Sequence, residues 1–282
     1  MKFYKIKSYA KLNLSLGVLR KLEKNLHKIE SLITFITLHD DILVKAINKK
    51  KHIIKFSGKF SKNLSKDNSI SNLLKILDDN KKIENQKYLI KVHKKIPQKS
   101  GMAGGSMNAA FLLRYLLKTK KFKLNPNEMK KISKKIGSDL MIGMKKKNSI
   151  LYGTGKFKLI KRNLNLFVIL LMPNFGCSTK EIYKGVKNYS KPIFKTKEKL
   201  NLNHKFFKSL KNDLEKPAFK KYPKLKKIKI FMEKMEKILF ARMTGSGSTI
   251  VGYFISKKAA LNAEKILKKK YKNYWCILSK TI

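Results

Sequence analysis

A glycine-rich stretch in the middle of the chain has the residue types of a phosphate-binding loop. Residues 95–110 read KIPQKSGMAGGSMNAA, with a strand-like apolar run before them at 88–92 and a good helix former after them at 109–117. Small residues let backbone amides point inward, and the first turn of a helix adds unpaired N–H groups and the positive end of the helix dipole. The stretch therefore favours phosphate binding over the alternative, a flexible turn that leads into a helix.

This loop differs from two common nucleotide-binding motifs. The P-loop pattern Gly-x-x-x-x-Gly-Lys-[Ser/Thr] is absent, because Gly105 is followed by Ser106 and Met107. The spacing of Gly101 and Gly104 also breaks the G-x-G-x-x-G dinucleotide pattern.

One aspartate of the seven stands out by its surroundings. Asp40-Asp41 and Asp78-Asp79 lie in polar sequence, whereas Asp139 stands between Gly137-Ser138 and the apolar run 140–142. An acid at the edge of an apolar segment can be held away from bulk water, which suits a general base. The alternative is that Ser138 or Asp139 only caps the next helix, and the residues leave both interpretations open.

A second candidate group follows from strand periodicity near the N-terminus. If residues 11–19 form a half-buried strand, Leu12 and Leu14 face the core and Lys11 shares the other face with Asn13 and Ser15. A lone histidine such as His27 is more often a packed or surface residue than a ligand.

A second glycine turn occurs late in the chain, at Gly245-Ser-Gly247. It is either a plain hairpin turn or, with Thr244 and Ser246, a set of amides and hydroxyls around an anion. The sequence contains no His/Cys/Asp/Glu cluster with metal spacing and no Gly-x-Ser-x-Gly elbow.

Alternating short strands and helices must position these residues. Strands are expected at 2–9, 11–19, 31–37, 41–47 and 166–173, with a turn at 39–41, and helices at 68–77, 127–136, 179–186, 225–237 and 257–270. The polar, aperiodic stretch 187–206 is expected to be a mobile connection. The length and pattern predict a chain of strands and helices in two domains, 1–162 with the glycine-rich loop and 163–282.

Composition narrows the class of protein further. The chain has 282 residues and 43% hydrophobic residues, with no run long enough to span a bilayer and no N-terminal segment typical of secretion. Its two cysteines fit no metal or redox spacing, so a cytoplasmic protein is expected.

The formal charge of +51 suggests polyanion binding, but only four of the 68 basic residues are arginines and the lysines are spread along the whole chain. Arginine is the residue that clamps phosphates and reads base edges, so we expect no specific nucleic-acid partner.

Three segments together resemble a known family. Residues 10–14 (AKLNL), the loop 97–110 and residues 243–247 (MTGSG) resemble, in order and spacing, the three motifs of the GHMP small-molecule kinases. Supporting similarities are His27, Asp67-Asn68, Gly137-Ser-Asp139 and residues 212–215 (NDLE). The resemblance covers nearly the whole chain and implies a two-domain α+β fold with a cleft between the domains, ATP with Mg²⁺, and a cytidine diphosphate-linked sugar alcohol that is phosphorylated on its 2-hydroxyl.

The resemblance also implies roles for individual residues. Asp139 corresponds to the base that takes the hydroxyl proton, and Lys11 to the cation that holds Asp139 ionised. Contacts to the substrate are implied for Asn13, His27, Thr179 and Tyr183. Contacts to ATP are implied for Asn68, Pro97, Gln98, Lys99, Ser100, Gly101, Met102, Ala103, Gly104, Gly105, Ser106 and Met107. The Mg²⁺ ligands are unassigned.

The chain departs from the family pattern at a few positions. Leu26 stands where the family usually has an aromatic residue, and Met107 where a serine is usual; Lys99 and Ser100 stand where small residues are common. A GHMP kinase with a different alcohol substrate, or a polyanion-binding protein without activity, are the alternatives. Both a monomer and a homodimer remain open.

Overall fold

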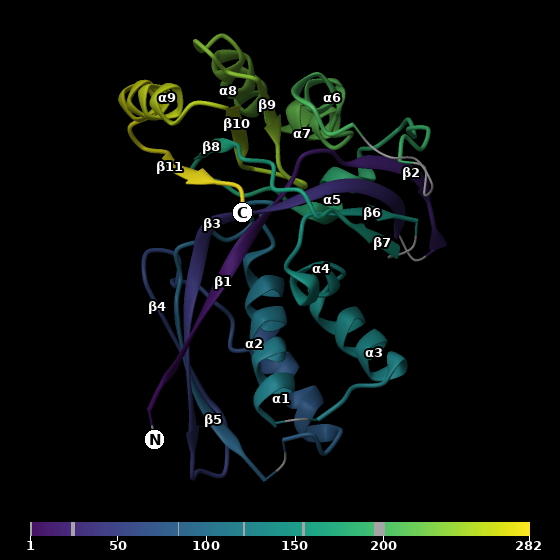
Figure 1. Cartoon of the computed structure of the whole chain (residues 1–282), viewed down its shortest axis with the longest axis vertical. Coiled ribbons are helices and arrows are strands. Elements are labelled where there is room, and N and C mark those ends of the chain that lie inside the picture. Colours follow the sequence, from purple (N-terminus) through teal and green to yellow (C-terminus); the bar gives the residue numbers. More distant parts are fainter. Residues whose placement is uncertain (1, 24–25, 84, 121, 154–155, 195–200) are drawn as a thin grey trace. The chain divides into compact units, whose positions relative to one another are not determined.

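The computed structural model describes residues 2–23, 26–83, 85–120, 122–153, 156–194 and 201–282 as an α+β protein (Figure 1). Its strands are β1 (Tyr4–Asn13), β2 (Gly17–Lys21), β3 (His27–Ile47), β4 (Ile53–Ser57), β5 (Lys87–His93), β6 (Ser149–Tyr152), β7 (Lys156–Leu159), β8 (Phe167–Met172), β9 (Phe240–Met243), β10 (Ile250–Phe254) and β11 (Trp275–Lys280). Its helices are α1 (Ser69–Asp79), α2 (Gly104–Lys120), α3 (Pro126–Ile136), α4 (Asp139–Lys145), α5 (Thr179–Lys184), α6 (His204–Ser209), α7 (Glu215–Lys221), α8 (Pro223–Glu233) and α9 (Lys257–Lys270). No helix in the described ranges has the length and apolar character that a bilayer crossing requires.

The chain forms two compact units that alternate along the sequence. Unit 1 contains residues 1–10, 38–98 and 103–146, and unit 2 contains residues 11–37, 99–102 and 147–282. Strand β3 contributes its first part to unit 2 and its second part to unit 1. The units are therefore interleaved along the chain.

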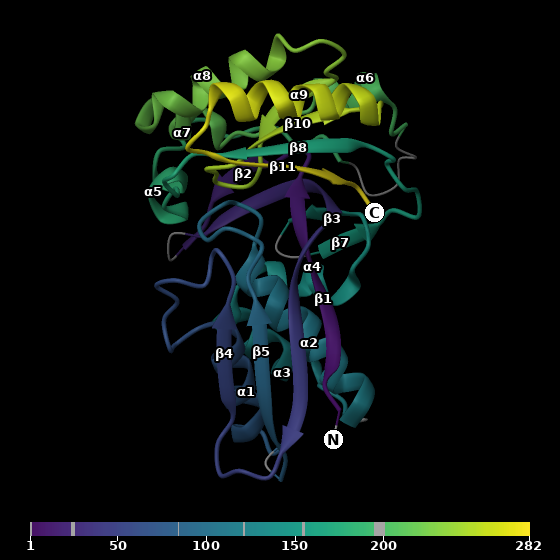
Figure 2. The ribbon, with the colours of Figure 1, turned by 90° about the vertical axis from the view of Figure 1, so that its left-hand side faces the viewer.

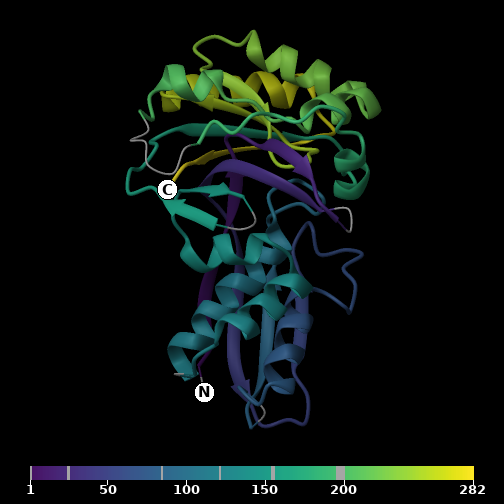
Figure 3. The ribbon, with the colours of Figure 1, turned by 90° about the vertical axis from the view of Figure 1, so that its right-hand side faces the viewer.

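Unit 1 is a sheet with helices on one face (Figures 2 and 3). β5 lies between β3, to which it is antiparallel, and β4, to which it is parallel. Helix α2 packs against α1 and α4. The expected helices at 68–77 and 127–136 are confirmed as α1 and α3, each begun by an asparagine capping box, Asn68 with Ser71 and Asn125 with Glu128.

Unit 2 is layered (Figure 2). Its four-stranded antiparallel sheet has the order β11-β8-β10-β9, with α8 and α9 on one face and the strand pair β2 and β3 on the other. The apolar run at 166–173 is confirmed as β8, whose residues Val168 to Leu171 are fully buried because both faces of the strand are covered. Helix α9 has the expected limits. A mobile connection was expected at 187–206, and residues 195–200 of it lie outside the described residues.

Two expected strand boundaries were wrong. The segments 31–37 and 41–47 are one continuous strand, β3, without the turn expected at 39–41. Adjacent aspartates typify turns, but in β3 they alternate between faces: Asp40 is fully buried, and Asp41 contacts Lys5 and Lys95. At the N-terminus the strands expected at 2–9 and 11–19 are β1 and, after a bend, β2.

Candidate active site

Three segments far apart in sequence meet within unit 2 through hydrogen bonds that their backbone amides donate. The amide of Lys11 donates to the carbonyl of Met102 at 3.4 Å, and the amide of Ser248 donates to the carbonyl of Lys99 at 3.3 Å. The amide of Asn13 donates to the hydroxyl of Thr244 at 3.0 Å. The first motif, part of the glycine-rich loop and the late glycine turn therefore form one cluster.

Glycines are required where the two loops touch. Gly101 has φ +76°, and a Cβ at this position would overlap the carbonyl oxygen of Thr244. Gly245 has φ +54°, and a Cβ there would lie 2.8 Å from the carbonyl oxygen of Gly101. Both residues adopt a left-handed conformation that residues with a side chain disfavour, and neither position has room for a Cβ. The two turns pack backbone against backbone.

Residues 212–215 brace the late glycine turn. The buried side chain of Asn212 donates to the carbonyls of Met243 and Gly245 at 2.7 and 2.8 Å, and Glu215 accepts from the amide of Met243 at 2.8 Å. Asp213 accepts from the amide of Val18 at 2.7 Å. The segment that supported the family resemblance thus ties the turn to the N-terminal strands.

Lys11 lies on the face that strand alternation predicted. Its ammonium donates to Asn13 Oδ1 at 2.7 Å, while Leu12 and Leu14 point to the opposite face and are fully buried. Lys11 and Asn13 are themselves only 5% and 4% exposed. Among the described residues Lys11 and Lys94 are both buried lysines in a chain of 64, and such burial is unusual because taking an ammonium out of water is costly.

The rest of the glycine-rich loop belongs to unit 1 and begins a helix. Gly104 is the first residue of α2, and Gly105 in its first turn is exposed. A helix of 17 residues presents the positive end of its dipole and its unpaired amides at this terminus. These amides are the expected phosphate donors.

A buried carboxylate that the sequence analysis overlooked joins both flanks of this loop. Asp40 is fully buried, pairs with the ammonium of Lys94, and accepts from the amides of Lys95 at 2.7 Å and Ile96 at 2.9 Å. It also accepts from the side chain of Asn108 in α2 at 3.0 Å. Asp40 is therefore buried among polar partners, whereas its sequence neighbours suggested an ordinary polar segment. The available signal was its place in the buried series Ile36, Leu38, Asp40, Ile42 and Val44.

Asp139 is the first residue of α4 and is half-buried, as expected for an acid beside an apolar segment. Ser138 makes no capping bond with its side chain, so the capping alternative has no support from that residue. Gly137, at φ +123°, packs against the loop: a Cβ there would lie 3.3 Å from Ser106 Oγ, which donates to the carbonyl of Ile136 at 3.3 Å. Within unit 1 the segment before Asp139 thus borders the start of α2.

Comparison with known proteins agrees with this arrangement. A model described as GHMP kinases N terminal domain matches residues 68–146, and one described as GHMP kinases C terminal matches residues 195–273. A 4-diphosphocytidyl-2-C-methyl-D-erythritol kinase of Pelagibacter ubique is 52% identical over 282 residues, which cover 100% of each chain. The chain belongs to the GHMP kinase family.

Other relatives of this GHMP kinase are more distant. A protein of Petrotoga mobilis with the same name is 34% identical over 87% of the chain and 96% of its own length. A solved 4-(cytidine 5'-diphospho)-2C-methyl-D-erythritol kinase has a TM-score of 0.78 at 21% identity, covering 98% of this chain and 99% of its own. Homoserine kinase from Cytophaga hutchinsonii has a TM-score of 0.67 at 15% identity, covering 100% and 95%. The family models fall on either side of residue 162, and the division into 1–162 and 163–282 stays a prediction.

The expected substrate contacts of this GHMP kinase gather in unit 2. The rings of His27 and Tyr183 lie 4.9 Å apart between centroids, and the hydroxyls of Thr179 and Ser246 are hydrogen-bonded at 2.9 Å. Burial, together with the charge of Lys21, lowers the pKa of His27 and favours its neutral form. Leu26 is 63% exposed, so its side chain is not part of the core.

The residues expected to contact ATP differ in how far they are exposed to solvent. Pro97, Ser100, Met102, Gly104 and Met107 are buried; Gly101, Ala103 and Ser106 are half-buried; Gln98, Lys99 and Gly105 are exposed. Gln98 donates to the carbonyls of Phe60 and Lys62. Of this set, the first turn of α2, with Gly105 exposed, is best suited to meet an anion.

Two members of the set also contribute to the local structure. Asn68 caps α1 and also donates to the carbonyls of Ser65 and Lys66, so its side chain is occupied. The side chain of Met107 is fully buried beside Gly143, and its amide donates to the carbonyl of Ala103 at 2.9 Å. Asn68 and Met107 therefore contribute to loop and helix structure, and their contact with ATP stays a prediction.

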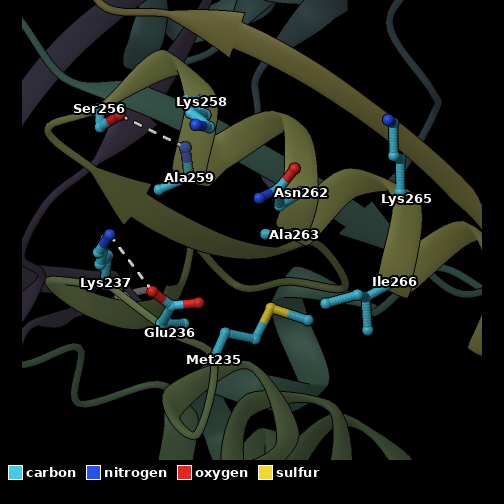
Figure 4. Close-up of a pocket in the computed structure, with 10 residues that line it drawn as sticks. All are labelled: Met235, Glu236, Lys237, Ser256, Lys258, Ala259, Asn262, Ala263, Lys265 and Ile266. Carbon is cyan, nitrogen blue, oxygen red and sulfur yellow. Dashed lines mark hydrogen bonds and ion pairs between the residues drawn. The ribbon is translucent and has the colours of Figure 1, made fainter.

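Of two surface pockets, one lies beside an expected site residue and the other does not. One, of about 610 Å³, lies in unit 1 beside Asn68. It is lined by Asp67, Ser71, Asn72, Lys75, Ile76, Asp79, Asn80, Lys131 and Lys135. Another, of about 390 Å³, lies in unit 2 between the end of α8 and α9, and none of the expected site residues lines it (Figure 4). The described residues contain no cluster of three or more metal-ligating side chains.

Proposed function

We propose that this chain catalyses the ATP-dependent phosphorylation of the 2-hydroxyl of 4-diphosphocytidyl-2-C-methyl-D-erythritol, a step in the non-mevalonate route to isoprenoid precursors. It is a small-molecule kinase by its family. The observation that carries the proposal is the backbone contact of the three motif segments in unit 2, in a chain that matches the Pelagibacter ubique kinase over its full length.

In this proposal the chemistry is positioning and charge neutralisation. The substrate oxygen attacks the γ-phosphorus of ATP, the bond from that phosphorus to the β-phosphate bridging oxygen breaks, and ADP leaves. Asp139 accepts the hydroxyl proton, and Lys11 stabilises the negative charge of the moving phosphoryl group. The amides at the start of α2 hold the phosphates.

ATP is proposed to bind together with Mg²⁺. This ion usually keeps several waters and takes one or two carboxylates beside the substrate phosphates, so it does not need a full cage of protein ligands. Ser106, at the start of α2, is the oxygen donor of unit 1 that we would test as a ligand. When bound, the ion supplies charge neutralisation at the phosphates.

Substrate recognition is proposed for the unit 2 residues around His27 and Tyr183. A neutral imidazole beside an aromatic ring suits an uncharged base such as cytosine, which stacks and offers hydrogen-bonding edges. The cell compartment proposed for the enzyme is the cytoplasm, in keeping with two free thiols at Cys177 and Cys276.

A coupled ADP-release assay tests the function directly. The purified chain is offered the diphosphocytidyl sugar alcohol, mevalonate, homoserine and galactose at equal concentrations. We expect turnover with the diphosphocytidyl substrate to exceed the others by at least ~100-fold, because a site built to hydrogen-bond its substrate discriminates strongly. Comparable turnover of another alcohol would replace the substrate assignment, and no turnover of any would remove the kinase proposal.

A further inference from the structure

A chain of buried polar groups leads away from Lys11 within unit 2. Lys11 donates to Asn13 Oδ1 at 2.7 Å, and Asn13 Nδ2 donates to the hydroxyl of Ser31 at 2.7 Å. The hydroxyl of Ser31 in turn donates to the carbonyl of Ser15. Ser31 is fully buried and Ser15 is 2% exposed. Nothing assigned so far to the substrate or to ATP involves Ser31.

The direction of each hydrogen bond in this chain is fixed by chemistry. A carbonyl only accepts, so Ser31 must spend its single hydrogen on Ser15. Ser31 can then only accept from Asn13, which must turn its NH₂ group toward Ser31 and its oxygen toward the opposite side. An ammonium only donates, so Lys11 requires that oxygen.

The backbone around these side chains is held independently of them. The amide of Leu14 donates to the carbonyl of Leu32 at 2.8 Å, and the amide of Leu32 donates to Ser15 Oγ at 3.0 Å. The amide of Asn13 is fixed on Thr244. The freedom that remains is the rotation of the Asn13 amide, whose two orientations differ in whether oxygen or NH₂ faces Lys11.

We propose that Ser31 is a positioning residue for the phosphoryl transfer: it holds the Asn13 amide in the orientation that fixes the ammonium of Lys11. The inference rests on the proposed function, since it takes Lys11 as the cation of the reaction. Without Ser31 the Asn13 amide loses the bond that anchors its NH₂ group, so its oxygen is held less firmly and the ammonium of Lys11 is fixed less well in the site.

The primary test is the steady-state kinetics of Ser31→Ala. We expect kcat to fall roughly tenfold, as for the loss of one hydrogen bond to a charged group, with the KM for ATP changed less than about twofold. Ser31→Thr keeps the hydroxyl and should restore kcat. Ser31→Cys keeps the volume with a weak acceptor and should resemble Ser31→Ala, which guards against a packing defect.

A matched control separates kinetics from stability. Thr34 lies three residues further along β3, is fully buried and donates to Asn148 at 2.8 Å. Thr34→Val removes a buried hydroxyl without touching the chain of groups to Lys11. It should lower the unfolding temperature about as much as Ser31→Ala and leave kcat unchanged.

A double-mutant cycle tests the orientation mechanism itself. The two oxygens of a carboxylate are alike, so Asn13→Asp removes the need for an orienting group. In the Asn13→Asp background, Ser31→Ala should change kcat less than about threefold, against roughly tenfold with Asn13. An equal loss in both backgrounds, or an unchanged kcat in Ser31→Ala alone, overturns the inference.

Failure of the inference and failure of the proposed function give different results. If Lys11→Ala is inactive and Ser31→Ala is fully active, only the role of Ser31 is lost. If Lys11→Ala retains wild-type turnover, the role proposed for Lys11 is wrong, and the role of Ser31 falls with it.

Discussion

Single side chains carry the proposed reaction, and the role of Asp139 as the proton acceptor can be tested directly. Replacing Asp139 with Asn keeps its size but removes the proton acceptor. We expect kcat to fall at least ~100-fold while the dissociation constant of ATP stays nearly constant, because a general base acts in the transition state rather than in nucleotide binding. ADP release measures the first quantity and titration calorimetry the second. Wild-type turnover in this variant would exclude Asp139 from the mechanism.

Gly101 offers a prediction about the contact between the two glycine loops. Gly101→Ala places a Cβ against the carbonyl of Thr244 and strains a backbone at φ +76°. We expect the free energy of unfolding to fall by about 2 kcal/mol or more and ATP affinity to weaken with it. Urea unfolding checks the first expectation.

Gly105→Ala is the control for Gly101→Ala. Gly105 is exposed, and the nearest atom to an added Cβ is Ser69 Oγ at 3.2 Å. This substitution should leave the free energy of unfolding nearly unchanged, since alanine is favoured over glycine in a helix. Equal losses in both variants would contradict the packing argument.

The sequence predicted the places of some individual residues well and of others poorly, for physical reasons. Lys11 and Asn13 were placed on one face correctly because strand alternation is local. Asp40 was misjudged because its partners, Lys94 and Asn108, are 54 and 68 residues away. The burial of Met107 also depends on surroundings that no local pattern contains, whereas the cap formed by Asn68 is made with Ile70 and Ser71 and is local.

Among the secondary-structure elements, the junction of β4, β5 and α1 depends on one histidine. His52 Nδ1 accepts from the amide of Tyr88 at 3.0 Å, and Nε2 faces Asp78 at 3.0 Å. Burial lowers the pKa of His52 below the ordinary value of 6.5, although Asp78 opposes this shift. A proton on Nδ1 would break the hydrogen bond from the amide of Tyr88, which agrees with a lowered pKa for His52.

The pH dependence of stability follows from that shift. Below pH 6.5 the unfolded chain takes up a proton at this position more readily than the folded chain, so stability rises with pH there and is lost on acidification. His52→Gln should therefore flatten the slope of unfolding free energy against pH between about 5 and 6.5. Urea titrations at several pH values measure this slope, and an unaltered slope would count against the assignment.

The elements differed in how far sequence could predict them. Helices with a strong apolar spacing or a cap, such as α1 and α3, were found, and β8 was recognised by its unbroken apolar run. Strand β3 was divided in error because His39-Asp40-Asp41 has turn composition. The short helices α6 and α7 were not expected, since each has only six or seven residues and too few apolar positions for a period.

For the molecule as a whole, the formal charge of +51 predicts a response to salt. Like charges repel in the compact state, and raising ionic strength from about 0.01 M to 0.15 M shortens the screening length from about 30 Å to 8 Å. We expect the unfolding temperature to rise over this range, and equally in NaCl and KCl. Thermal unfolding followed by circular dichroism measures it. A temperature that stays constant or falls would show that repulsion does not limit stability.

The alternation of the two units along the chain has a consequence for cutting and rejoining the polypeptide. The chain passes between the units at residues 10, 37, 98, 102 and 146, so no single break releases either unit whole. A fragment that starts at residue 163 would keep β8 to β11 but lose β2 and the first part of β3, which cover the second face of that sheet. Its apolar face would be open to water, and such a fragment should aggregate when produced alone and gain solubility when co-expressed with residues 1–162.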